Sequence, residues 1–215
     1  MKNKILNLIN HEYFWIYFSL FGIVIQFVTY LLTNDSYLSF ISGFAGVLSV
    51  VLCSERKLSF YFWSFLQIIT FFYLSYQERL YANMVEYIFY FITALVGIFI
   101  WFKNKKIEDG CVESKSLTKK WNYIFSIVTA IIVTTITIIL STITDDTMPF
   151  LDSITTVSAF IAQFLMIFCY KEQWYYWMIV NIGSIIMWAI IGNYCMVAQF
   201  IFWTLNCFYG YYKWK

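Results

Sequence analysis

The chain has 215 residues, of which 61% are apolar, 23% aromatic and only 12% charged. Because soluble domains carry about 25% charged residues, this composition excludes an ordinary soluble domain and indicates a membrane protein. The formal net charge of +2 is too small to predict a surface that binds nucleic acid.

Apolar stretches follow one another along the chain, each close to the ~20 residues that cross the ~30 Å hydrocarbon core of a bilayer. They lie at 13–32, 38–53, 58–76, 81–102, 121–142, 149–170, 173–191 and 194–212. The extended polar segment 103–120 separates the fourth stretch from the fifth and is predicted to be a flexible cytoplasmic loop. The sequence therefore predicts an all-α membrane protein with eight transmembrane helices.

The basic residues predict the orientation of these spans. With eight spans, all Lys and Arg residues except Arg79 fall on one side of the membrane. The positive-inside rule then places both termini in the cytoplasm of a multi-pass cell-membrane protein. Asp35, Asp145 and Asp146 collect on the opposite side. The sequence does not decide whether the first stretch spans the membrane fully. If it does not span, only the N-terminal tail changes sides and the rest of the topology stays the same.

One polar stripe occurs twice in the sequence, with an offset of 113 residues. Its positions are separated by steps of 4, 7 and 4, which keep them on one side of an α-helix. The residues Glu86, Tyr90, Gly97 and Trp101 of the first copy recur as Gln199, Trp203, Gly210 and Trp214.

This repeat predicts the architecture. Each copy contains three spans, and the single span between the copies returns the chain to its starting side, so the copies are parallel. The expected parts are 1–36 (tail and extra N-terminal helix), 37–102 (first three-helix repeat), 103–120 (cytoplasmic loop), 121–142 (connecting helix) and 148–215 (second three-helix repeat). Parallel repeats that meet along polar faces build several transporter folds.

Several motifs resemble one family. They are ISGFAGVLSVVL (41–52), LSFYFWSFLQ (58–67), PFLDS (149–153), WYYWMIVN (174–181), YCMVAQF (194–200) and GYYKW (210–214). Together they resemble the PnuC family of vitamin-precursor transporters over about 38–214, and W-x-x-W-x-x-x-N after a charged turn is the most specific part.

The resemblance implies a 3+1+3 bundle similar to the SWEET sugar transporters. It also implies facilitated uptake of nicotinamide riboside, which a cytoplasmic kinase would trap by phosphorylation. Relatives of that family carry thiamine or other vitamins and nucleosides, so these substrates are alternatives.

Trp174, Trp177 and Asn181 are the first candidate site. Their spacing of i, i+3 and i+7 places two indoles and an amide on one helix face. Such a face suits a flat cationic heteroaromatic ring, since a desolvated cation–π contact is worth ~2 kcal/mol and an amide both donates and accepts. Trp174 equally fits the aromatic belt at a membrane interface.

Glu86 is the only acidic residue well inside an apolar segment, where a carboxylate is costly and usually functional or paired. A neutral Glu bonded to a neighbouring helix is the alternative interpretation. Gln199 is the repeat counterpart of Glu86, and the resemblance adds Gln67, because the family often has an amide there. The family's usual amide one position after Glu86 is Tyr87 in this chain. The predicted substrate-binding residues are Gln67, Glu86, Trp174, Trp177, Asn181 and Gln199.

Other polar and small residues have predicted packing roles. Gln26 and Asn206 are expected to join neighbouring helices, and Gly97 and Gly210 to permit a close approach. Asp152 is expected to favour the dipole at the start of its helix.

Enzymatic motifs are missing from the sequence. His11 is the sole histidine, so there is no HExxH motif, His-based triad or multi-histidine metal site, and no phosphate-binding G-x-x-x-x-G-K-[ST] loop occurs. No enzyme activity, cofactor or metal is predicted. A membrane sensor or scaffold is the alternative of a different class, although it does not explain the duplicated stripe. The expected partners are a small molecule and the lipid bilayer, and the sequence leaves a homo-oligomer open.

Overall fold

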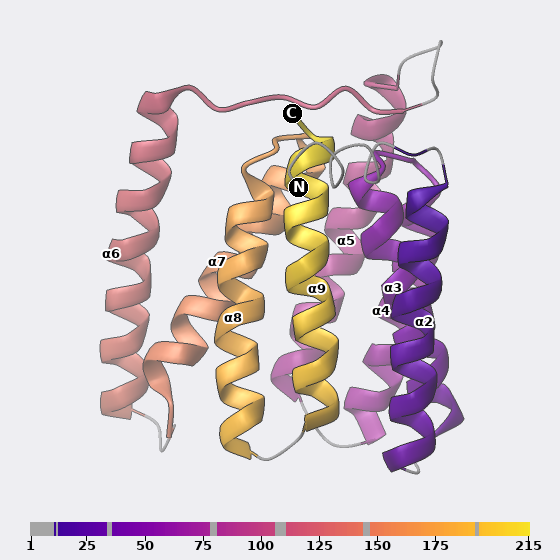
Figure 1. The fold of residues 1–215 in the computed structure, drawn as a ribbon. Coiled ribbons are helices and arrows are strands. Elements are labelled where there is room, and N and C mark those ends of the chain that lie inside the picture. Colours follow the sequence, from indigo (N-terminus) through magenta and orange to yellow (C-terminus); the bar gives the residue numbers. More distant parts are fainter. Residues whose placement is uncertain are drawn as a thin grey trace, which may run out of the picture. The chain divides into compact units, whose positions relative to one another are not determined.

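The computed structural model describes residues 11, 13–33, 36–77, 81–105, 111–143, 147–191 and 194–215. The described residues form eight α-helices (Figure 1). These are α2 (Phe14–Thr33), α3 (Tyr37–Ser54), α4 (Phe60–Gln77), α5 (Tyr81–Lys103), α6 (Lys119–Ile143), α7 (Pro149–Ile167), α8 (Gln173–Ile191) and α9 (Tyr194–Lys213). Each predicted apolar stretch corresponds to one helix, and the predicted all-α class is confirmed.

Five helical segments in the described part of the chain are long and apolar enough to cross a membrane. They are Phe14–Thr33, Tyr37–Ser54, Glu86–Lys103, Lys119–Ile143 and Pro149–Ile167, and α4 contains the shorter apolar segment Phe60–Leu74. Helices α8 and α9 contain Asn181, Gln199 and several Trp and Tyr residues, which lower their mean hydropathy. Arg79, Asp35, Asp145 and Asp146, which entered the topology prediction, lie outside the described residues, as do Lys2 and Lys4.

The chain divides into two compact units. The first comprises Met1–Glu113 with Tyr212–Trp214, and the second comprises Ser114–Tyr211 with Lys215. In the first unit α3 packs against α2 and α4, and α4 packs against α5. In the second unit α7 packs against α6 and α8. Within their units, α2 and α6 therefore hold equivalent places, each packed on the helix that follows it.

Helices α3 and α7 end in the same way. Arg56 follows α3 with φ 56°, and Cys169 follows α7 with φ 64°. A non-glycine residue in this left-handed region is uncommon. The two positions are separated by the same 113 residues as the polar stripe. The recurrence therefore extends from side-chain chemistry to backbone conformation.

The hydrogen bonds of both turns have the Schellman pattern, in which two amides after the helix return to carbonyls of its last turn. The turn at Cys169 ends α7 at Ile167, three residues before the end of the apolar stretch 149–170. In the first turn the bonds are Arg56 N to Cys53 O (2.9 Å) and Lys57 N to Leu52 O (3.0 Å), and in the second Cys169 N to Met166 O (3.0 Å) and Tyr170 N to Leu165 O (2.9 Å).

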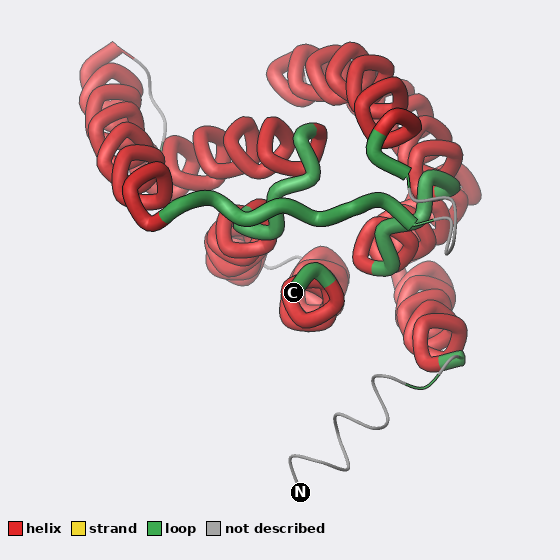
Figure 2. Tube along the Cα trace, turned by 90° about the horizontal axis from the view of Figure 1, so that it is seen from above, coloured by secondary structure: helices red, strands yellow, loops and turns green. Residues whose placement is uncertain are grey.

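The linker between α5 and α6 uses the carbonyls of these turns (green in Figure 2). Val112 N donates to Arg56 O at 2.9 Å, and Lys115 N donates to Cys169 O at 2.7 Å. Lys171 N returns a bond to Lys115 O at 2.9 Å. Backbone groups left over at the turns therefore find partners in residues 111–118 of the linker. Residues 106–110 lie outside the described part.

Cys169 itself is fully buried at its turn. Burial raises the pKa of its thiol to about 11, although the charge of Lys115 acts in the opposite direction. The thiol is therefore protonated at neutral pH and acts as a small packing group.

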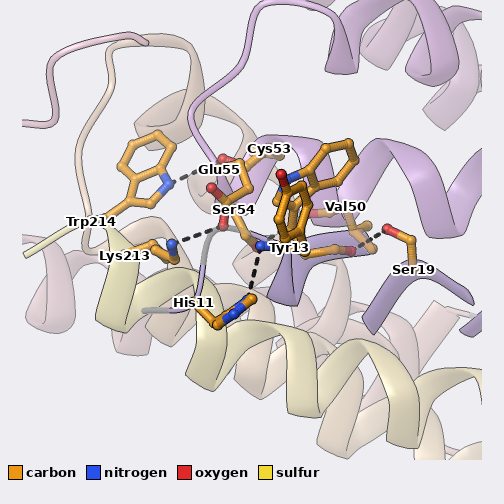
Figure 3. Close-up of polar contacts among 10 residues, drawn as sticks. His11, Tyr13, Ser19, Val50, Cys53, Ser54, Glu55, Lys213 and Trp214 are labelled. Atoms are coloured by element: carbon orange, nitrogen blue, oxygen red, sulfur yellow. Dashed lines mark hydrogen bonds and ion pairs between the residues drawn. The ribbon is translucent and has the colours of Figure 1, made fainter. Parts of the chain in front are cut away.

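The end of α9 is fixed to the turn after α3 within the first unit (Figure 3). Trp214 Nε1 donates to Cys53 O at 3.1 Å, and Lys213 Nζ lies 3.2 Å from Glu55 Oε1. The buried rings of Trp101 and Trp214 lie 5.8 Å apart between centroids. These two tryptophans are counterparts in the repeated stripe, and they contact each other.

Candidate functional site

Trp174 and Asn181 of α8 both face α9 in the second unit. The Trp174 side chain is 3% exposed and lies on Gly210, where an added Cβ would overlap its indole ring. Asn181 is equally buried, and its Nδ2 lies 3.3 Å from Cys207 Sγ. Gly210 and Cys207 are three residues apart on α9, so they share a face. The aromatic-belt interpretation of Trp174 is wrong, because this ring is enclosed by protein.

Trp177 is half-buried and lies to one side of that contact. It packs at the edge of a cluster of buried residues formed by Ala162 and Leu165 of α7 and Tyr176 of α8. The structure therefore brings Trp174 and Asn181 together against α9 and places Trp177 toward α7.

Gln199 and Trp203 of α9 carry polar groups without partners. Gln199 is 7% exposed, and neither its Nε2 nor the Nε1 of Trp203 has a hydrogen-bond partner among the described residues. A spacing of four residues places the two side chains on one helix face. A buried donor without a partner costs about 1–3 kcal/mol. A ligand that accepts hydrogen bonds would remove that cost.

Trp203 was not among the predicted site residues. Its position in the repeated stripe, as the counterpart of Tyr90, was the signal that could have selected it.

In the first unit the corresponding residues, Glu86 and Tyr90, are hydrogen-bonded to each other. Tyr90 donates its hydroxyl to Glu86 Oε1 at 2.6 Å, along one turn of α5. The neighbouring ring of Tyr87 stacks on Phe71 of α4, with centroids 5.4 Å apart and planes inclined by 8°. The two copies of the stripe therefore differ chemically. The first pairs a carboxylate with its own neighbour, whereas the second leaves two donors open.

Gln67 of α4 and Gln26 of α2 both pack on α3. An added Cβ at Gly46 would lie 2.9 Å from Gln67 Nε2, and one at Gly43 would lie 2.5 Å from Gln26 Oε1. The predicted packing role of Gln26 is confirmed. Gln67 has the same kind of contact, so it helps to join α3 and α4 whether or not it binds a ligand.

Gly97 and Gly210 permit the predicted close approach, and what approaches them is an aromatic side chain. A Cβ at Gly97 would overlap the hydroxyl of Tyr61, and one at Gly210 would overlap the ring of Trp174. Tyr61 and Trp174 are themselves 113 positions apart. The duplicated stripe therefore has a duplicated partner on the second helix of each repeat. The start of α7 also agrees with prediction, with Pro149 at its first position and Asp152 in its first turn.

The described residues are helical, include several apolar spans and bury polar side chains between helices, which is the organisation of a multi-pass membrane protein. Comparison with known proteins agrees. Residues 36–215 match the family described as "Nicotinamide mononucleotide transporter". The chain belongs to this family, and it is a transporter rather than an enzyme.

Its relatives include proteins named "Nicotinamide riboside transporter PnuC". The protein from Haemophilus influenzae is 35% identical over 89% of this chain and 85% of its own length. The protein from Neisseria mucosa is 28% identical over 88% of this chain and 76% of its own length. The structure is similar to "Crystal structure of the Vitamin B3 transporter PnuC", with a TM-score of 0.80, 26% identity and coverage of 95% and 92% of the two chains. The resemblance inferred from the motifs is confirmed.

Proposed function

We propose that the protein carries nicotinamide riboside into the cell by facilitated diffusion and that intracellular phosphorylation then traps it. The observation that carries this proposal is the buried pair of open donors on α9, Gln199 Nε2 and Trp203 Nε1. The ribose and the carboxamide of the substrate both present oxygen acceptors to such donors. The indoles of Trp174 and Trp177 suit its pyridinium cation, and the names of the relatives point to the same substrate.

The distribution of charge favours the riboside over the mononucleotide that the family description names. A phosphate group is usually held by Arg or Lys. In the described helices these residues occur only in first or last turns, at Lys103, Lys119, Lys120 and Lys213. The acidic residues of the candidate spans are Glu86 of α5 and Asp152 in the first turn of α7, and a carboxylate would repel a phosphate and attract a cation. Our proposed recognition residues in the second unit are Trp174, Trp177, Asn181 and Gln199. In the first unit we propose Glu86 for its charge and Gln67 on the resemblance to the family.

Transport is expected to need no gradient of a coupling ion, because facilitated diffusion is driven only by the electrochemical gradient of the substrate itself. Liposomes containing the pure protein and loaded with unlabelled nicotinamide riboside should take up labelled riboside by counterflow in symmetric buffer. Labelled nicotinamide mononucleotide and labelled thiamine serve as comparison substrates and should exchange far more slowly. A strict requirement for a sodium or proton gradient would exclude facilitated diffusion, and exchange of thiamine instead would change the substrate.

The trapping step can be tested separately in cells. The substrate is a cation, so the membrane potential alone would concentrate it inside an energised cell. In depolarised cells without a cytoplasmic riboside kinase, internal nicotinamide riboside should rise only to the external concentration, whereas restoring the kinase should restore accumulation. Accumulation above the external level in the depolarised, kinase-deficient cells would show that another energy source drives uptake.

We also propose that both termini are cytoplasmic and that the helices form parallel repeats in a 3+1+3 arrangement after one N-terminal helix. The equivalent turns at Arg56 and Cys169 support the repeat. In a cysteine-free background, cysteines at Lys2 and Lys215 should resist an impermeant maleimide in intact cells and react after permeabilisation. A cysteine at Arg79, on the predicted outer side, should react in intact cells. Labelling of the C-terminus from outside would overturn this topology, and labelling of the N-terminus alone would remove only the first span.

A further inference from the structure

The second unit contains a groove of about 570 Å³ bounded by α6, α7 and α8. Figure 1 shows that α6 meets α7 near their connected ends and diverges from it toward the end where α8 begins. The groove is lined by Asn122, Ser126 and Val133 of α6, by Ser158 of α7, and by Glu172 and Ile179 at and beyond the start of α8. Nothing in the proposed transport mechanism uses it.

Glu172 gives the groove a charged end. This side chain is 3% exposed, and its Oε1 accepts a hydrogen bond from Ser116 Oγ at 3.0 Å. Its Oε2 has no hydrogen-bond partner among the described residues, and neither has the buried hydroxyl of Ser158. Glu172 is the only charged residue of the lining. A buried carboxylate oxygen without a partner is costly, so a cationic donor is the group that this end of the groove would bind.

The remainder of the groove is apolar in character. The hydroxyls of Thr129 and Thr134 donate to carbonyls of their own helix, at 2.6 Å to Phe125 O and 2.8 Å to Ala130 O. These residues therefore use up their donors within α6. Val133, Ile154 and Ile179 contribute hydrocarbon to the lining. A ligand must combine a cationic group with an apolar body.

The length of the groove matches one leaflet of a bilayer. From Asn122 to Thr134 the lining follows α6 for ~18 Å at 1.5 Å per residue, slightly more than half of a ~30 Å hydrocarbon core. Among the residues of α6, Val133 alone is buried, and large apolar side chains such as Ile127, Ile131 and Ile138 are exposed. A groove of this length on an apolar helix has the dimensions of a site for a lipid chain.

We propose that this groove binds one phospholipid with a primary ammonium head group, an ethanolamine lipid, with the ammonium on Glu172 and an acyl chain along Val133 and Ile179. Lys119 is three residues before Asn122 and seven before Ser126, on the same face of α6, where its charge complements the phosphate. A choline head group has no N–H to donate, and a glycerol head group has no cation. The counterpart of Glu172 in the first repeat is Ser59, so the acidic site belongs to the second repeat alone.

The test is to reconstitute the full chain in vesicles of equal parts ethanolamine, choline and glycerol phospholipid, then extract it and count retained lipids by native mass spectrometry. The wild type should retain one ethanolamine lipid preferentially. Glu172→Gln should lower that retention roughly tenfold or more, since a hydrogen bond to a charged group is worth about 1.5–3 kcal/mol. Glu113→Gln, which removes an exposed carboxylate of the same linker, should keep the preference.

A second variant tests the space in the groove and leaves the charge of Glu172 unchanged. Ala130→Trp should fill the groove and abolish retention of a bound lipid of any head group, while Glu172→Gln affects ethanolamine lipid selectively. Equal retention of the three lipids by the wild type would overturn the proposal, as would an unchanged preference in Glu172→Gln. If Ala130→Trp altered the oligomer mass and left lipid retention intact, the groove would be a contact between copies of the chain. Because none of these measurements involves transport, the proposal stands or falls separately from the substrate assignment.

Discussion

Gly210→Ala is expected to lower the stability of the protein by about 1–3 kcal/mol, the usual cost of overpacking a filled site. The added methyl group would overlap the indole ring of Trp174, which is a rigid and buried neighbour. Replacing Trp174 by Leu in the same chain should recover part of the loss, because the two positions are in contact and their effects are not additive. The measurement is the melting temperature of the purified protein in detergent.

Gly97→Ala provides the matched experiment in the first repeat, and its rescue is more specific. The overlapping atom there is the hydroxyl oxygen of Tyr61, and the next nearest atom, Cζ, lies 3.0 Å from the added Cβ. Tyr61→Phe removes only the oxygen and should restore most of the lost stability. Melting temperatures that match the wild type for both glycine variants would mean that neither site is tightly packed.

Trp177→Ala is expected to weaken binding of nicotinamide riboside by roughly 5- to 30-fold, the loss of about 1–2 kcal/mol of stacking. Asn181→Leu keeps the volume and deletes the amide, and the substrate group that it served would be left unpaired at similar cost. Titration of the purified protein with the riboside measures both effects. Trp121→Ala, which removes an exposed indole near the start of α6, is the control and should leave affinity unchanged.

Both residues also have packing contacts, so affinity must be separated from stability. Cys207→Ala removes the thiol bonded to Asn181 but leaves the amide in place. If Asn181 binds substrate, this variant should retain affinity even where it melts earlier. Folded Trp177→Ala and Asn181→Leu proteins with full affinity would show that this face only packs. Gln199 and Trp203 would then be the residues to substitute next.

Glu86→Gln separates charge from shape at the hydrogen-bonded pair of the first repeat. Its amide can still accept from the Tyr90 hydroxyl, so the local bond is retained while the charge is removed. The loss of affinity should be large for a pyridinium substrate and small for a neutral nucleoside. Equal losses of affinity for the pyridinium substrate and the neutral nucleoside would show that the Glu86 carboxylate does not interact with the charge of the substrate.

The helices could be predicted from the sequence because charged and polar residues bound nearly every apolar run. The end of α7 could not, because its run continues through the turn at Cys169, and no glycine marks the left-handed residue. The repeat could be recognised from the side chains of the polar stripe, but not from the two equivalent turns, because no shared residue type marks the turns in the sequence. Arg56 and Cys169 share a backbone conformation and nothing in their side chains.

Some features of the linker and of the candidate site could not be predicted from sequence patterns. Residues 111–118 bind backbone carbonyls of distant turns, and the buried apolar residue Val112 is the only local sign of this. In the site, helical spacing predicted that Trp174 and Asn181 share a face. Helical spacing could not predict that Glu86 accepts a hydrogen bond within its own helix while Gln199 Nε2 has no partner among the described residues. That difference depends on side-chain conformation.

The left-handed residues after α3 and α7 also bear on how the protein can be made more robust. Such a conformation costs an L-residue about 1–2 kcal/mol, whereas glycine adopts it freely and loses only about 0.5–1 kcal/mol through its extra freedom when unfolded. Glycine would therefore relieve backbone strain at either turn, before any loss of side-chain packing is counted. Arg56 is the better position for a glycine, because its side chain is only half-buried. Removing the fully buried Cys169 side chain would open a void that offsets the gain.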